Sequence, residues 1–237
     1  MYLSDIHTHS IASGHGTSCT ISDMAKAASK KGLKLLGITD HGPGTLAAGT
    51  SSYFRSLTYA PKKRFGIELL FGAELNILDT EGHLDLNDEL LSELDYAIAS
   101  MHAQNYKSGT VEENTSAYLN AMRHPCVKVL GHCDNPAFPV DYETLAFGAK
   151  EYGVIFEINE ASLMPGGYRG DTRANNKEIL RYCRKLEIPI VLSSDSHGVE
   201  HIGDFTCAAE FVHEMMFPEK MILNNDISRL KMILSER

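Results

Sequence analysis

The sequence predicts an α/β protein, a single-domain (β/α)7 barrel that spans residues 1–237. Short apolar runs alternate with helical stretches along the whole chain, which implies a parallel sheet covered by helices. No Rossmann glycine fingerprint follows any of these runs, and seven such units favour a closed barrel over an open sheet. No change of composition marks a linker, and a hydrophobic fraction of 43% is ample for one core.

The first unit is a short strand followed by a helix. Residues 2–6 are mostly apolar and are expected to form the strand. After a polar loop with two glycines, Ser22 or Asp23 is expected to cap a helix that runs to about Lys31 and is closed by Gly32.

The later strands are short apolar runs, and most of them lead directly into a histidine or an acidic residue. They are expected at residues 33–39, 67–73, 96–101, 127–131, 154–158 and 189–192. Helices are expected at residues 111–123, 142–152, 175–186, 206–216 and 227–234. The segment through Tyr59 is less regular, and the turn at residues 79–82 predicts a small hairpin before Leu84.

Composition excludes several classes of protein. The net charge is -9, and no basic block exceeds residues 62–64, which argues against nucleic acid as the main partner. The five cysteines are odd in number and scattered, so neither a disulfide framework nor a zinc knuckle is indicated, and a reducing cytoplasm fits best. No export signal or membrane span is recognisable, so we expect a protein that is not associated with a membrane.

The first strand leads into a pair of histidines, His7 and His9. Alternate side chains of an extended strand share a face, which places these two about 7 Å apart along the backbone, close enough to serve one metal cluster. On its own, a His-x-His pair is better explained as polar residues at a strand end. The further histidines and acids of the chain therefore decide the interpretation.

In a (β/α) barrel the carboxyl ends of all strands meet at one rim. Eight candidate ligands follow strands and so belong to this rim: His7, His9, His41, Glu74, His102, His132, Asp195 and His197. His15 lies in the first rim loop. Imidazole and carboxylate ligands suit zinc, and also manganese or iron. At three or four protein ligands each, the set could hold two or three ions if one carboxylate bridges them.

Other histidines and a cysteine do not share this placement. His83, His124 and His213 are interpreted as surface or packing residues, and His201 at best as a support for a ligand. Cys133 follows His132, but its side chain is expected to point the other way on an extended backbone.

Four motifs, DIHTHS, ITDH, GAELNI with a following G-x-L-D hairpin, and SSDSH, resemble those of the PHP (polymerase and histidinol phosphatase) superfamily, and most closely its small YcdX-type metal-dependent phosphatases. The resemblance covers nearly the whole chain. It implies a distorted (β/α)7 barrel that holds up to three metal ions at its rim.

The same resemblance implies a role for each ligand. A first ion would be held by His7, His9 and Asp195. A second ion would be held by His102 and His132, and Glu74 would bridge the two ions. The third site would be completed by His15, His41 and His197. Of these residues, Glu74, Asp195 and His197 are expected to be catalytic. The turn at residues 133–136 departs from the glycine-containing sequence common in the family, which leaves the pocket shape open.

The reaction implied is hydrolysis of a small phosphorylated metabolite, a phosphate monoester, by a metal-activated water. The sequence contains no Walker loop and no Asp-x-Asp nucleophile motif, so no phospho-enzyme is expected. Arg169, in a glycine-rich loop, could bind a phosphate oxygen or could simply be solvated at the surface. Asn159 and Asp134 could orient the ligands.

Three alternatives stay open. A metal-dependent amidohydrolase also uses His-x-His, but would bridge its metals through a modified lysine, where this chain offers Glu74. A nuclease or polymerase proofreading module is disfavoured by the acidic charge, and a non-enzymatic metal-binding module by the nearly complete ligand set. A homo-oligomer is also possible, because the C-terminal helices carry apolar side chains that fit either a core or a subunit contact: Phe211, Met215, Met216 and Phe217.

Overall fold

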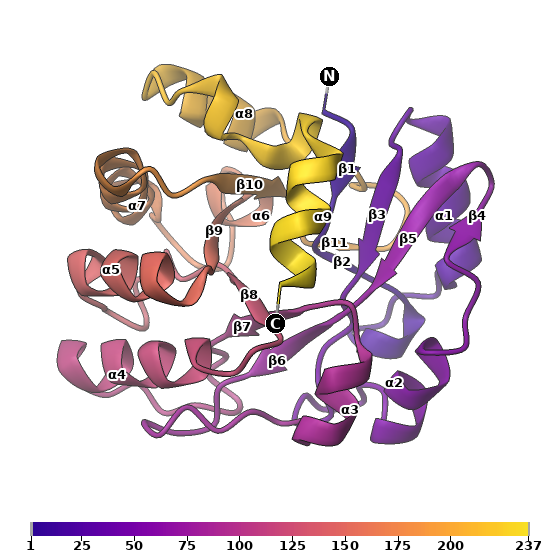
Figure 1. Ribbon diagram of the computed structural model, residues 1–237, viewed down its shortest axis with the longest axis horizontal. Coiled ribbons are helices and arrows are strands. Elements are labelled where there is room, and N and C mark those ends of the chain that lie inside the picture. The colour runs from indigo at the N-terminus through magenta and orange to yellow at the C-terminus, as the bar shows by residue number, and fades with distance from the viewer. Residues whose placement is uncertain (1, 237) are drawn as a thin grey trace.

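The computed structural model describes residues 2–236, and in it helices surround a ring of short parallel strands (Figure 1). The strands are β1 (Ser4–Asp5), β2 (Thr8–His9), β3 (Leu35–Ile38), β4 (Lys63–Arg64), β5 (Ile67–Phe71), β6 (Ala73–Asn76), β7 (Ala97–Ser100), β8 (Val127–Leu130), β9 (Ile155–Asn159), β10 (Ile190–Ser193) and β11 (Ser196–His197). The α-helices are α1 (Ile21–Lys30), α2 (Ser51–Leu57), α3 (Asp88–Glu93), α4 (Val111–Met122), α5 (Tyr142–Tyr152), α6 (Glu160–Leu163), α7 (Arg173–Leu186), α8 (Thr206–Glu214) and α9 (Ile227–Ser235).

The strands follow one another round the ring in chain order. One sheet has the order β1-β3-β5-β4, in which only β4 is antiparallel, and another has the order β10-β9-β8-β7-β6. The apolar run predicted as one strand from residue 67 is two strands, because the chain kinks at Gly72 so that β5 pairs with β3 and β6 with β7. A side chain at Gly72 would come within 2.6 Å of the Tyr96 carbonyl oxygen, so the kink requires glycine.

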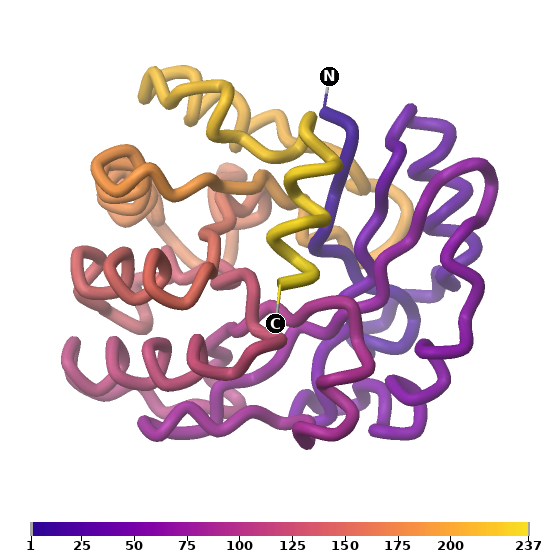
Figure 2. Tube along the Cα trace, viewed as in Figure 1, coloured from indigo at the N-terminus to yellow at the C-terminus, as the bar shows by residue number. Residues whose placement is uncertain are grey.

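The ring closes where its two ends meet. β11 pairs in parallel with β2 and sets His197 opposite His9. Figure 2 follows the chain round the barrel from the indigo first strands to the yellow C-terminal helix, which returns to them. If the antiparallel β4 is set aside, counting β1 with β2, β5 with β6, and β10 with β11 gives seven parallel strand positions, so the prediction of a distorted (β/α)7 barrel is confirmed.

Asn224 fills the part of this seam where β1 and β10 do not pair. Its side-chain amide donates to the carbonyl oxygens of Ser4 (2.9 Å) and Leu192 (2.7 Å) and accepts from the Leu192 amide (2.8 Å). Its own carbonyl accepts from the Leu3 amide and the Ser4 hydroxyl, both at 3.1 Å. One fully buried side chain therefore replaces the missing strand-to-strand hydrogen bonds.

The end of the barrel opposite the rim is closed by α9. Leu230 and Leu234 of this helix join the inner barrel cluster with Ile6, Ile98 and Val191. The helix lies beside residues that precede β9 and β10, so it covers the amino ends of the strands. The carboxyl ends therefore form the accessible face.

Several helices differ in detail from the expectation. The cap of α1 is Thr20, and neither Ser22 nor Asp23, because the Thr20 hydroxyl accepts from the Asp23 amide while the Asp23 carboxylate accepts from the Thr20 amide. Helices α2 and α3 lie in segments where no helix was predicted. The small hairpin is confirmed by an antiparallel bridge between Ile77 and Leu84.

The apolar residues near the C-terminus divide between core and surface. Phe211 and Phe217 are buried, whereas Met216 is 82% exposed. Of the helices described, none combines the length and apolar character that crossing a bilayer requires.

Candidate metal centre

The structure brings the nine predicted ligands to the carboxyl ends of the strands. His9 lies on β2, Glu74 on β6 and His197 on β11, whereas the others lie in the segments that follow or join strands: His7, His15, His41, His102, His132 and Asp195. His7, His9 and Glu74 are fully buried, although they are polar. Their convergence follows from the parallel strand directions, which place every strand end on the same face.

Glu74 lies in the middle of this group. Five imidazole nitrogens lie within 3.4 Å of its carboxylate oxygens, those of His7 (3.3 Å), His9 (3.4 Å), His41 (2.8 Å), His102 (3.3 Å) and His132 (2.7 Å). His41 and Glu74 also share an isolated parallel bridge, which continues the β3 side of the ring to β6. A carboxylate between so many ligand nitrogens has the position that a bridging group needs.

Asp195 forms a second, smaller meeting point. One of its oxygens lies 3.2 Å from His9 Nε2 and 3.7 Å from His7 Nε2. The other accepts from Arg169 at 2.8 Å and from Asn159 at 3.2 Å. Asp195 has a φ of 54°, and His132 and His15 also have positive φ values of 27° and 51°. Such strained backbone in non-glycine residues is typical of functional sites.

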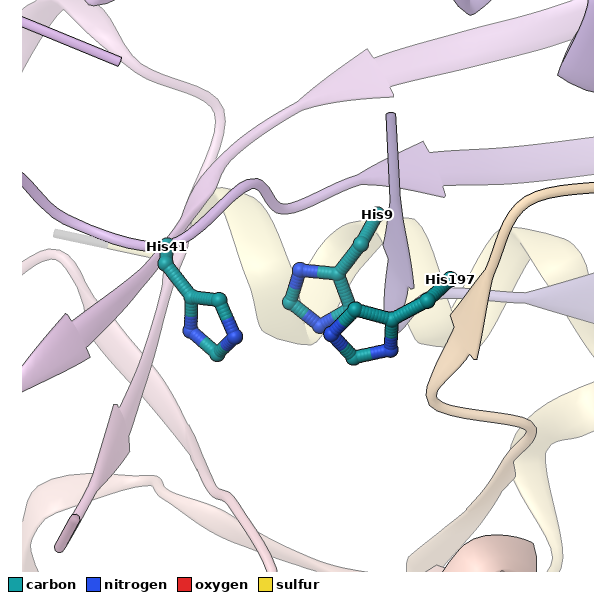
Figure 3. A group of neighbouring side chains, drawn as sticks. All are labelled: His9, His41 and His197. Carbon is teal, nitrogen blue, oxygen red and sulfur yellow. The ribbon is translucent and has the colours of Figure 1, made fainter. Parts of the chain in front are cut away.

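Within the predicted ligand set, three groups of ligand atoms are close enough to surround an ion, with all atoms of a group within 4.8 Å of one another. They are His7 with His9 and Asp195, His41 with Glu74 and His102, and His9 with His41 and His197. Figure 3 shows the last group, in which the His9 ring lies 4.4 Å from the His41 ring and 4.2 Å from that of His197.

Two predicted ligands lie beside these groups. His132 contacts Glu74, and the His15 ring lies 4.8 Å from that of His41 and 5.2 Å from that of His197. Which residue serves which ion stays a prediction.

The side chains fit a divalent metal. His7 Nε2, His9 Nε2 and His41 Nδ1 all lie within 3.4 Å of Glu74 Oε2, yet these four buried atoms make no hydrogen bond of acceptable geometry with any described residue. A buried polar atom without a partner costs about 1–3 kcal/mol, and here such atoms gather in one place. Imidazole nitrogen and carboxylate oxygen are the ligands that zinc and similar ions accept.

The outer nitrogen of several rings is already occupied. Nδ1 of His7 contacts Glu157 (2.8 Å), that of His9 contacts Ser13 (2.8 Å), and that of His102 contacts Asn76 (2.7 Å). These contacts fix each ring so that Nε2 points into the cluster, which is how proteins orient metal-binding imidazoles. Ser13 is held in turn by Asp40 at 2.7 Å.

Glu157 was not among the predicted site residues. It is buried on β9, where one oxygen contacts His7 Nδ1 and the other accepts from the His132 amide at 2.6 Å. The only signal in the sequence is a single carboxylate within the apolar run at residues 155–158. A buried carboxylate is costly unless it is paired. A carboxylate within an apolar run is therefore a candidate for a functional role.

Replacement of Glu157 by glutamine should lower metal affinity about 10–100-fold, because the His7 ring would lose its charged partner. Metal binding can be followed by titration of the stripped protein with zinc. The matched control is Glu151→Gln, an exposed position on α5. Equal affinities of the two variants would contradict this role for Glu157.

The charges around the cluster hold the carboxylates ionised. Burial alone would raise the pKa of Glu74, but His41, His7 and His102 keep it well below its usual range. The pKa of Asp195 is likewise raised by burial and lowered more strongly by His7 and Arg169. Burial and Arg169 lower the pKa of His132 to about 4. Burial lowers the pKa of His7 and His41, but the neighbouring carboxylates raise it more strongly, so metal binding would displace protons from these two rings, whereas His132 is already neutral.

An open cavity of about 570 Å³ leads to the cluster. Its lining includes His15, His102, His197 and Arg169. Arg169 is only 6% exposed, so the alternative of a solvated surface side chain is wrong. A shallower depression of about 1010 Å³ near residues 82–88 and 120–126 contains none of the predicted ligands.

The remaining histidines and Cys133 lie elsewhere. His83 is exposed and pairs with Asp79, and His124 contacts Asp88 at 3.1 Å. His201 and His213 are exposed. Cys133 is buried in the hydrophobic core, away from the ligand groups, as its alternation with His132 predicted.

A barrel with buried histidines and carboxylates at its carboxyl rim is the architecture of a metal-dependent hydrolase. The chain belongs to the PHP domain family, whose model matches residues 5–162. It is 39% identical to a probable phosphatase of Clostridium novyi over 236 residues, which cover 100% of this chain and 96% of the relative. A probable phosphatase of Clostridium acetobutylicum is 38% identical, with coverage of 97% and 93%.

Solved structures show the same fold. A putative histidinol phosphatase of Listeria monocytogenes matches with a TM-score of 0.62 at 21% identity, covering 85% of this chain and 97% of that one. Histidinol phosphate phosphatase of Lactococcus lactis, solved with zinc, L-histidinol and phosphate, gives 0.61 at 17% identity, with coverage of 92% and 95%. Together, the family, the full-length relatives and the ligand cluster identify a metal-dependent phosphatase.

Proposed function

We propose that this protein hydrolyses phosphate monoesters of small metabolites at a centre of three zinc-type divalent ions. The observation that supports it most strongly is the position of Glu74, whose carboxylate has five imidazole nitrogens within 3.4 Å. More ligands converge here than one four-coordinate ion can use. All five cysteines lie in the described part of the chain and none of them forms a disulfide, which suits the reducing cytoplasm predicted from the sequence.

Each protein group has a part in this proposal. His7, His9, His15, His41, His102, His132 and His197 hold the ions together with Asp195 and the bridging Glu74. When bound, divalent ions of this kind lower the pKa of a water molecule and neutralise the charge of a phosphate group. His197 has a side chain that is 34% exposed and lines the cavity, so it lies on the side from which substrate enters.

Arg169 is proposed to bind the phosphate. Its guanidinium donates to Asp195 (2.8 Å), Ser162 (3.1 Å) and Asn159 (3.3 Å). A guanidinium has about five N–H groups, so these three contacts fix its plane and leave roughly two for an anion. Planar, bidentate pairing with phosphate is the interaction for which arginine is best suited.

The reaction breaks the bond between phosphorus and the ester oxygen and forms a bond between phosphorus and a water oxygen. The alcohol leaves with a proton, and inorganic phosphate is the second product. No residue becomes covalently modified, because the chain's own groups bind and orient the phosphate without attacking it.

Removal of metal should abolish turnover of an aryl phosphate such as p-nitrophenyl phosphate. The protein is treated with a chelator, dialysed and assayed before and after zinc or manganese is restored. We expect loss of more than about 10³-fold, since metal ions contribute several kcal/mol to phosphoryl transfer. Activity that survives complete stripping, verified by metal analysis, would end the proposal.

A further inference from the structure

The cavity beside the ligand cluster is lined by two kinds of side chain. The first kind comprises the histidines, Asp195 and Arg169. The second kind belongs to loops that follow β7, β8 and α6 and is mostly apolar: Met101, Ala103, Gln104, Ala137, Phe138 and Tyr168. Phosphate requires only the first kind, so the second is available to the alcohol part of the substrate.

The inner part of the apolar lining is fixed by packing. Phe138 is 4% exposed and Met101 1%, so packing fixes both side chains. The Phe138 ring also contacts the Tyr106 ring, with centroids 6.1 Å apart. At the outer edge, Tyr168 is 79% exposed and stacks on the Arg169 guanidinium at 4.5 Å. Gln104 and Asn135 add neutral amides to the same wall.

The cavity lacks a free negative charge. Among the described residues that line it, Asp195 is the one carboxylate, and its two oxygens already face His9, Arg169 and Asn159. A cationic group bound here would lose its hydration without gaining a counter-charge, which is unfavourable. A neutral, apolar group would instead gain from burial.

We infer that the physiological substrate is the phosphate ester of an uncharged, largely apolar alcohol, and that esters with an ammonium group are selected against. This inference rests on the proposed function and adds the class of alcohol that the site accepts. Ala103, Ala137 and Tyr168, which are exposed in the lining, contact the carbon skeleton, and Gln104 or Asn135 lies in the same wall to meet a hydroxyl or carbonyl group of the alcohol. A cavity of about 570 Å³ is the size of an ordinary metabolite site.

Two esters of the same shape test the charge directly. Phosphocholine and 3,3-dimethylbutyl phosphate differ in one atom, a quaternary nitrogen in place of a carbon. With the metal-loaded enzyme we expect kcat/KM to be at least about 10-fold higher for the neutral ester. The dissociation constants of the matching unreactive phosphonates, measured by calorimetry, should show the same order without any turnover.

A substitution in the cavity wall provides a second test. Gln104→Glu adds a carboxylate to the cavity. The ratio of kcat/KM for the neutral ester to that for phosphocholine should fall about twofold to fivefold, as expected for an exposed ion pair. Asn225→Asp is the matched control, because it adds the same charge at an exposed position next to the seam residue Asn224, outside the cavity lining. The control should keep the wild-type ratio.

The outcomes are separable. Equal or better use of phosphocholine, or equal phosphonate affinities, would overturn the inference and leave the phosphatase proposal intact. Failure of both esters and of p-nitrophenyl phosphate would overturn the proposed function, while the phosphonate affinities would still decide the preference of the cavity. If p-nitrophenyl phosphate is hydrolysed but neither of the two alkyl esters is, the dissociation constants of the two phosphonates test the inference.

Discussion

Replacement of Glu74 by glutamine should leave the protein folded but remove at least one bound ion and reduce kcat/KM about 10³-fold or more. Glutamine keeps the volume of the side chain and removes the charge on which five imidazoles converge. A ligand that serves two ions contributes to both, and several kcal/mol of barrier correspond to such a factor. Metal analysis of the purified variant and the aryl phosphate assay measure the two effects.

The control for this variant is Glu160→Gln. Glu160 is also buried, but it lies on α6, where its carboxylate accepts from the amides of Cys207 (2.9 Å) and Ala208 (2.7 Å) at the start of α8. This variant should lose some stability and keep its metal. If Glu74→Gln retains the full metal content, Glu74 does not bridge the ions.

Replacement of Asn224 by alanine should lower the free energy of unfolding by about 3–5 kcal/mol. The change leaves two carbonyl groups and one amide of β1 and β10 without partners inside the protein, at about 1–3 kcal/mol for each buried group. Denaturant unfolding of the metal-free protein measures the loss. Asn224 holds β1 and β10 together, and these two strands lead directly to His7 and Asp195. The affinity for metal should therefore fall as well.

The neighbouring residue is a close control for this change. Asn225 is exposed, and its replacement by alanine should alter the free energy of unfolding by less than about 0.5 kcal/mol. Equal stabilities of the Asn224 and Asn225 variants would show that the side-chain bridge does not hold the barrel closed.

The sequence predicted the ring of strands well because each apolar run carried its own signal. Helix α5 was predicted at residues 142–152, the range that it occupies. The short helices α2 and α3 were missed, since they contain only a turn or two and little periodicity. The kink at Gly72 was missed because one apolar run pairs with different neighbours before and after it.

The sequence by itself determined that nine histidines and carboxylates reach one rim, because most of them directly follow an apolar run and the alternation of strands with helices implies parallel strands that end on one face. Only the tertiary structure decided that Glu74 lies among five imidazoles, that Glu157 supports His7, and that Asn224 closes the ring. These contacts join residues far apart in the chain, and no short-range pattern records them. The buried setting of Arg169 was decided in the same way, by packing against Asp195 and Ser162 from other segments.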